Sequence, residues 1–142
     1  KGNADLCAHF FLRAAGLLKP NGNLGLLAVN TIAEGDTRQV ALEAMLRAGY
    51  SIYAAVPNFE WPGAAVVVAS AVYLHRGLWG GLYCLNGEIV PTISAFLSSE
   101  TEWSPMPLVA NANKSFIGSY VLGTGFVIRE EEANELIDEN AR

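Results

Sequence analysis

Cysteine, charge and long apolar runs are all scarce in this 142-residue sequence, and each shortage excludes a class of protein. The two cysteines, Cys7 and Cys84, are too few and too isolated for a disulfide scaffold or a zinc knuckle. We therefore expect two small buried residues in a reducing compartment. No uninterrupted apolar run reaches the roughly 18 residues of a membrane-spanning helix, so no membrane partner is expected. Charged residues make up 16% of the chain and hydrophobic residues 51%, which predicts a folded domain with a buried core.

Basic residues are outnumbered by acidic ones. The formal net charge of −5 argues against a general electrostatic grip on nucleic acid. Six of the fourteen acidic residues, however, lie in the tail segment EEEANELIDEN, and without residues 129–142 seven basic residues face eight acidic ones. On charge alone, the body of the protein is neither attracted to DNA nor excluded from it.

No catalytic or metal-binding constellation stands out in the residues themselves. His9 and His75 are far apart in sequence and have no obvious acidic partner. No serine lies in a nucleophile-elbow pattern, and no His, Cys or Asp spacing matches a metal site, so no metal is predicted. The segment PNGNLG follows a predicted helix and precedes a predicted strand, which is the wrong order for a dinucleotide-binding loop.

Apolar periodicity predicts the order α-β-α-β-β in the first half of the chain. Residues 4–18 are predicted to form a helix, and residues 24–30 an almost wholly apolar strand of the kind buried in a parallel sheet. Asp36 or Thr37 is expected to cap a second helix that ends at residue 47. Residues 50–56 and 64–74 are expected to form two antiparallel strands joined by the turn at 57–63. This order is typical of the closing half of a doubly wound α/β sheet.

The glycine-rich stretch RGLWGG, residues 76–81, marks the predicted boundary between domain 1–76 and a smaller α+β segment, 77–142. In that segment the pattern predicts a short strand, an Asn-Gly turn, a short helix and then a loop. Residues 115–128 alternate and contain regularly spaced glycines, which favours bent strands. An acidic helix is expected from about Glu130.

Two stretches resemble N6-adenine DNA methyltransferases of restriction–modification systems. Residues 4–32, ADLCAHFFLRAAGLLKPNGNLGLLAVNTI, resemble the stretch that follows the catalytic motif of those enzymes: Asp-Leu-Cys opens a helix, an aromatic follows one turn later, and Leu-Leu-Lys-Pro-Asn-Gly precedes an apolar strand. Residues 59–74, FEWPGAAVVVASAVYL, resemble their later aromatic-proline turn and strand. Together with 116–128, the resemblance spans nearly the whole chain and is strongest to single-chain enzymes that combine restriction and modification.

The resemblance implies a fold and a function. Residues 1–76 would be the C-terminal half of a Rossmann-like methyltransferase sheet, and 77–142 a linker and the start of the target-recognition domain. The full-length parent would transfer a methyl group from S-adenosylmethionine to the N6 amine of a flipped adenine in duplex DNA, in the cytoplasm of a prokaryote. The family's glycine-rich cofactor loop and its Asn-Pro-Pro-aromatic catalytic motif are absent from these residues, so the chain alone is expected to be inactive.

The same resemblance assigns candidate site residues. Trp61 corresponds to the aromatic before proline and is the first candidate for stacking on the flipped base, with Phe59 second. Phe10 corresponds to the aromatic that packs against the adenine of S-adenosylmethionine, and Asp5 opens the same motif. The remaining candidates are the pocket residues Asn30, Thr31 and Pro62 and the DNA-contacting residues Lys114 and Arg129.

Other interpretations of these residues and of the whole chain stay open at this point. Trp61, Phe59 and Phe10 are alternatively core residues, Asn30 and Thr31 strand-end caps, and the two basic residues ordinary surface charges. The protein could be a methyltransferase-fold enzyme with a non-DNA substrate, or a non-catalytic DNA-recognition or assembly module. The first strand lies at an open edge of an incomplete sheet, through which the chain is expected to self-associate.

Overall fold

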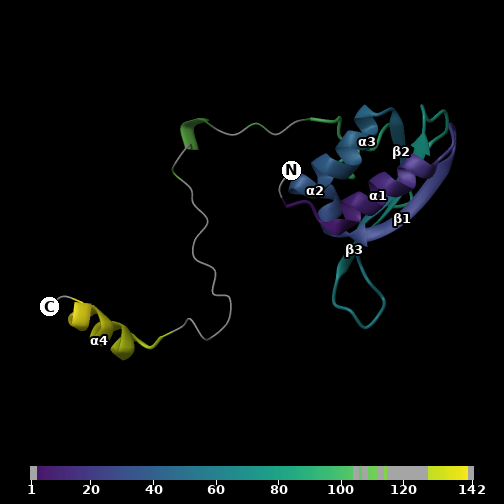
Figure 1. Ribbon diagram of the computed structural model, residues 1–142. Coiled ribbons are helices and arrows are strands. Elements are labelled where there is room, and N and C mark those ends of the chain that lie inside the picture. The colour runs from purple at the N-terminus through teal and green to yellow at the C-terminus, as the bar shows by residue number, and fades with distance from the viewer. Residues whose placement is uncertain (1–2, 104–105, 107–108, 112–113, 115–127, 141–142) are drawn as a thin grey trace. The chain divides into compact units, whose positions relative to one another are not determined.

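The computed structural model describes residues 3–103, 106, 109–111, 114 and 128–140 (Figure 1). The chain divides into two compact units, Lys1–Ser104 and Pro105–Arg142. The predicted division after residue 76 falls inside the first of these units, because β4, at Tyr83–Leu85, pairs with β2, at Tyr50–Glu60. The assignment of the two stretches to separate functional domains stays a prediction.

The first unit is a mixed α/β fold, as predicted. Helix α1 spans Leu6–Leu17, and a 3-10 turn, η1, spans Asn30–Ala33. A second helical run is continuous over α2, a π-helical turn η2, and α3, at Gly35–Arg38, Gln39–Glu43 and Ala44–Arg47. The remaining strands are β1 at Asn23–Val29, β3 at Val68–Arg76 and β5 at Glu88–Val90.

The five strands form one sheet in the order β1-β3-β2-β4-β5. Strand β3 is antiparallel to both β1 and β2, so β1 and β2 run in the same direction with β3 between them. The predicted α-β-α-β-β order and its antiparallel hairpin are therefore confirmed. The prediction that residues 24–30 lie inside a parallel sheet is wrong for this unit, because β1 is an edge strand whose described neighbour is antiparallel.

Helices α1, α2 and α3 lie on the same face of the sheet (Figure 1), and the core forms between them and the strands. Phe11 is buried in this core, whereas Phe10 is 64% exposed on the outer side of α1. The interpretation of Phe10 as a core residue is therefore wrong, and the adjacent Phe11 occupies that place. The other core residues are Ala8, Ala15, Ile32, Ala41, Leu42, Met45, Ile52, Ala55, Val72, Leu74, Ile93, Ala95 and Leu97.

The second helical run begins earlier than predicted and without a side-chain cap. Glu34 precedes the run and makes no capping hydrogen bond, and the run starts at Gly35. The predicted capping side chains serve α1 instead: the Thr37 hydroxyl accepts from the Asp5 N–H at 3.0 Å, and the Asp36 carboxylate accepts from the Asn3 N–H at 3.3 Å. Tertiary hydrogen bonding to the start of α1 has displaced the local capping pattern.

Strand β2 extends four residues beyond its predicted end, and β3 begins four residues after its predicted start. The extension includes an irregularity between Val56 and Phe59, where Asn58 adopts a φ of 54°. Such a bulge lets the strand continue through a segment that reads as a turn. The connecting loop is consequently 61–67 rather than 57–63.

The Asn-Gly turn between β4 and β5 is confirmed, with φ values of 53° at Asn86 and 85° at Gly87. The short helix predicted after it is wrong: the described residues 91–103 contain neither helix nor strand. Leu97, with a φ of 54°, interrupts the helical pattern, and its N–H donates to the Ser94 carbonyl at 2.9 Å. Burial of apolar side chains from this segment in the core stabilises the irregular backbone.

In the second unit, α4 spans Glu130–Asn140, which confirms the acidic helix, and a short turn η3 spans Val109–Asn111. The bent strands predicted at 115–128 lie outside the described residues except for Ile128. No helix in the described part of the chain is both long enough and apolar enough to cross a bilayer.

Candidate functional site

The carboxyl ends of β1 and β2 lie on either side of the first residues of β3. Val29 of β1 and Phe59 of β2 both pair with Ala69, and Glu60 pairs with Val68. The segments that follow these two strands, starting at Asn30 and Trp61, therefore leave the sheet at the same edge. This edge is the one that sequence reasoning selected, because ligands of open α/β sheets bind beyond the carboxyl ends of the strands.

The hairpin loop 61–67 borders an open, solvent-accessible cavity of about 320 Å³, lined by Glu60, Trp61, Gly63 and Ala65–Val68. The Trp61 N–H donates to the Val67 carbonyl at 3.0 Å and closes the loop. Most of the lining is apolar side chain, and a volume of this size is at the lower end of those that bind small molecules. The loop can therefore receive a flat, largely apolar group.

Trp61 is the aromatic side chain of this cavity. Its side chain is 41% exposed, so it is not covered as a core residue would be. Phe59 lies within β2 and is half-buried beside Ala69, and it does not line the cavity. Pro62 is exposed in the loop and does not line the cavity either. Of the two aromatic candidates, Trp61 is the one that faces a space in which a planar group would fit.

Asp5, Thr31 and Thr37 form a polar cluster at the start of α1. The Asp5 carboxylate caps α1 by accepting from the Cys7 N–H at 3.4 Å, and its other oxygen accepts from the Thr31 hydroxyl at 3.5 Å. Asn30 is half-buried, and its amide donates to the Glu34 carboxylate at 3.3 Å. None of these side chains lines the loop cavity. The cluster therefore has a structural role that is complete without a ligand.

The Cys7 thiol beside this cluster is not activated. Partial burial, and secondarily the Asp5 carboxylate, raise the pKa of the Cys7 thiol above its ordinary value. A raised pKa keeps the sulfur protonated at neutral pH, and the thiolate is the nucleophilic form. The described residues contain no cluster of three or more His, Cys, Asp or Glu side chains that would hold a metal ion.

The two candidate DNA-contacting residues belong to the second unit. Lys114 is exposed. Arg129 is 82% exposed and lies 3.7 Å from the Glu132 carboxylate, next to the acidic helix α4. Neither residue has a described position relative to the loop cavity, so their contact with DNA stays a prediction.

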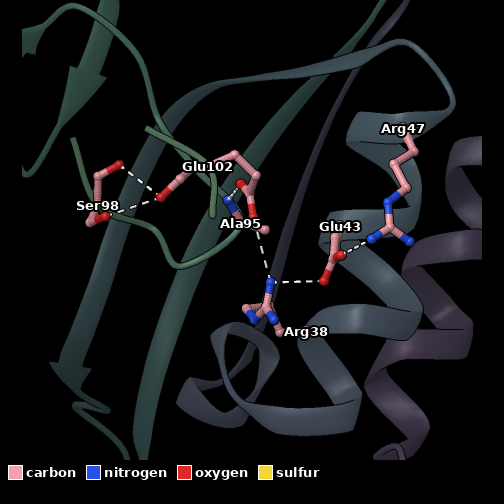
Figure 2. Close-up of polar contacts among 7 residues, drawn as sticks. Arg38, Glu43, Arg47, Ala95, Ser98 and Glu102 are labelled. Atoms are coloured by element: carbon pink, nitrogen blue, oxygen red, sulfur yellow. Dashed lines mark hydrogen bonds and ion pairs between the residues drawn. The ribbon is translucent and has the colours of Figure 1, made fainter. Parts of the chain in front are cut away.

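Sequence reasoning missed a buried ion-pair network centred on Arg38 (Figure 2). The Arg38 guanidinium lies 2.9 Å from the Glu43 carboxylate and 3.5 Å from the Glu102 carboxylate, and it stacks on the Phe96 ring at 4.0 Å. Glu43 also pairs with Arg47, and Glu102 accepts from the Ala95 N–H at 2.6 Å. The network attaches the irregular segment 91–103 to the second helical run.

No family model and no curated protein matches this sequence. Among solved structures, the fold is similar to part of the type IIL restriction-modification enzyme MmeI, whose structure was determined in complex with DNA. The TM-score is 0.61 at 20% sequence identity, and the match covers 97% of this chain and 22% of that enzyme. At this identity the comparison shows a shared fold, and the chain spans about a fifth of the enzyme's length.

Proposed function

We propose that this chain is a segment of an adenine-specific DNA methyltransferase of the restriction–modification type. Residues 1–76 would be the C-terminal half of its Rossmann-like catalytic sheet, and 77–142 the linker and the start of target recognition. The sequence resemblance and the fold shared with MmeI, a restriction-modification enzyme solved with DNA, support the proposal. The single observation that carries it is the exposed Trp61 indole over the loop cavity, at the carboxyl edge of β1 and β2.

Trp61 would act on the substrate by stacking. An enzyme that modifies a base inside a duplex swings that base out of the helix at a cost of a few kcal/mol. Stacking on an aromatic side chain returns roughly 1–3 kcal/mol per base. The apolar residues Ala65–Val68 line the same cavity and would contact the edge of a base that stacks on the indole. The contribution of these residues is therefore the positioning of the adenine amine for direct attack.

S-adenosylmethionine would supply the methyl group as an electrophile. Phe10 fits this cofactor best among the described candidates, because its exposed ring on α1 is free to pack on a purine. Asp5 fits less well, since both of its carboxylate oxygens already accept hydrogen bonds within the unit. The residues that would polarise the adenine amine in this family belong to the Asn-Pro-Pro-aromatic motif, which these 142 residues do not contain.

The test is methyl transfer by the full-length protein that contains these residues. Incubated with S-adenosylmethionine carrying a tritiated methyl group, the protein is expected to label duplex DNA. Label found only in a small molecule, a protein or RNA would overturn the DNA assignment in favour of another methyltransferase substrate. Absence of any transfer, with DNA binding retained, would show a non-catalytic recognition module. In a prokaryotic cell, the proposal places this activity in the cytoplasm.

We further propose that the isolated 142-residue chain self-associates through β1. In the described part of the chain, the outer edge of β1 has no paired strand, and Leu27 on this strand is 57% exposed. Unpaired strand edges are templates for pairing with another chain. Leu27→Lys is expected to weaken dimerisation about tenfold or more, measured by sedimentation velocity over a concentration series. The control is Leu78→Lys, at a 95% exposed position outside the strands. A monomeric wild-type chain, or equal effects of both substitutions, would contradict this interface.

A further inference from the structure

The indole of Trp61 lies directly against Gly63. A Cβ atom added at Gly63 would be 2.4 Å from Nε1 and 2.9 Å from Cδ1 of Trp61, closer than real Cβ atoms approach other heavy atoms. Gly63 is not among the glycines with positive φ, so its backbone conformation is open to any residue. A side chain added at position 63 would therefore meet the ring of Trp61 in its present orientation, and it would not strain the backbone of the turn.

Trp79 also lies over a glycine, but unlike Trp61 it makes further contacts that hold its ring in place. Trp79 lies over Gly81, where an added Cβ would be 3.0 Å from the ring. The Trp79 indole also donates to the Leu82 carbonyl at 3.1 Å and stacks on Tyr53 at 4.5 Å between centroids. In the described part of the chain, the Trp61 side chain has neither a hydrogen bond nor an aromatic partner. Trp79 is thus fixed by several contacts, whereas the Trp61 ring rests on Gly63 and lines the cavity.

We propose that Gly63 is a positioning residue for base stacking, because the missing Cβ lets the Trp61 indole lie against the loop backbone with its ring lining the cavity. The inference rests on the proposed function, in which a flipped adenine stacks on Trp61. A methyl group at position 63 displaces the indole by rotation about its two side-chain bonds. The loop itself stays closed, since the Trp61 N–H keeps its bond to the Val67 carbonyl. The substitution consequently acts on the stacked base and not on the fold.

Gly63→Ala in the full-length protein is the direct test. We expect kcat/KM for duplex DNA to fall about tenfold, within the range that one base–aromatic stack supports. Affinity for S-adenosylmethionine is expected to stay unchanged, and fluorescence of 2-aminopurine at the target adenine is expected to report reduced stacking. Gly80→Ala is the matched control, because an added Cβ there meets nothing within 4 Å and its φ is not positive. Wild-type kinetics in Gly63→Ala would overturn the proposal.

A double-mutant cycle with Trp61→Ala separates positioning from a general effect on the loop. The atoms closest to the added Cβ are Nε1 and Cδ1 of the indole, and Trp61→Ala removes both. Gly63→Ala should therefore cost less than about threefold in the Trp61→Ala background, so the two effects are not additive. An equal loss in both backgrounds would show that Gly63 acts through the backbone and would overturn the proposal.

Fluorine NMR separates failure of this inference from failure of the proposed function. In protein labelled with 5-fluorotryptophan, the Trp61 signal is assigned by its loss in Trp61→Phe, and we expect it to shift in Gly63→Ala. An unshifted signal would overturn the ring contact whatever the substrate is. The opposite combination is also distinguishable: if the signal shifts in Gly63→Ala but the wild-type protein transfers no methyl group to DNA, the proposed function is overturned. The contact between Trp61 and Gly63 then still stands.

Discussion

Replacing Trp61 by alanine in the full-length protein is expected to lower DNA methylation between about fivefold and more than a hundredfold. This range is the ~1–3 kcal/mol that one base gains by stacking on an aromatic side chain. Under the proposed function the loss falls on the DNA step, because Trp61 lines the loop cavity while Phe10, the candidate cofactor contact, lies on the outer side of α1. Affinity for S-adenosylmethionine, measured by calorimetry, should therefore change little.

Three comparison variants give the Trp61 prediction its specificity. Trp61→Phe keeps a stacking ring and should retain most of the methylation activity. Phe59→Ala removes a half-buried strand residue, so it should lower the free energy of unfolding and have little effect on base stacking. Trp103→Ala serves as a control for loss of a tryptophan, since that side chain stacks on Phe96 in the irregular segment. Unchanged methylation in Trp61→Ala would mean that the base does not stack there.

The second large expected effect is on stability, at Arg38. Arg38→Ala should lower the free energy of unfolding by about 3–5 kcal/mol, the usual cost of removing one partner of a buried ion pair. The Arg38 side chain is 2% exposed and that of Glu43 is 9% exposed, so the substitution leaves a buried carboxylate with Arg47 as its remaining cation. It also removes the cation that stacks on Phe96, which anchors the segment 91–103. Urea denaturation followed by circular dichroism measures the change.

Two further variants show whether loss of the buried ion pair, rather than loss of packing, lowers the free energy of unfolding. Arg38→Met together with Glu43→Met should be less destabilised than Arg38→Ala, since an apolar pair of similar size leaves no buried carboxylate at position 43. Arg129→Ala removes one partner of an exposed pair and should change the unfolding free energy by about 1 kcal/mol or less. A loss in Arg38→Ala no larger than that in Arg129→Ala would contradict a stabilising role for the network.

The order of elements in the first unit could be predicted because local signals agree with the fold there. The apolar spacing in residues 6–17 and the capping Asp5 define α1, and the Asn86-Gly87 pair defines its turn. The predictions that were wrong lie where contacts distant in sequence decide the conformation. Thr37 and Asp36 bond to the start of α1 rather than to their own helix, and β2 continues past Val56 because it pairs with β3.

The candidate site could be predicted only in part. An aromatic-proline turn before an apolar strand indicates the loop and Trp61, because such a composition is unusual in a turn. The contact between Trp61 and Gly63 depends on a side-chain rotamer that no spacing encodes. The Arg38 network could not be predicted from the sequence either, because Glu102 lies far along the chain from Arg38 and an arginine in a helix is usually a surface residue.

The most direct measurement is the identity of the methylated nucleoside. Duplex DNA treated with the full-length protein and S-adenosylmethionine is digested to nucleosides, which are separated and analysed by mass spectrometry. The proposal predicts N6-methyldeoxyadenosine, formed by the wild-type protein and strongly reduced in Trp61→Ala. Methylated cytosine as the product, or N6-methyldeoxyadenosine formed equally well without the Trp61 indole, would contradict it.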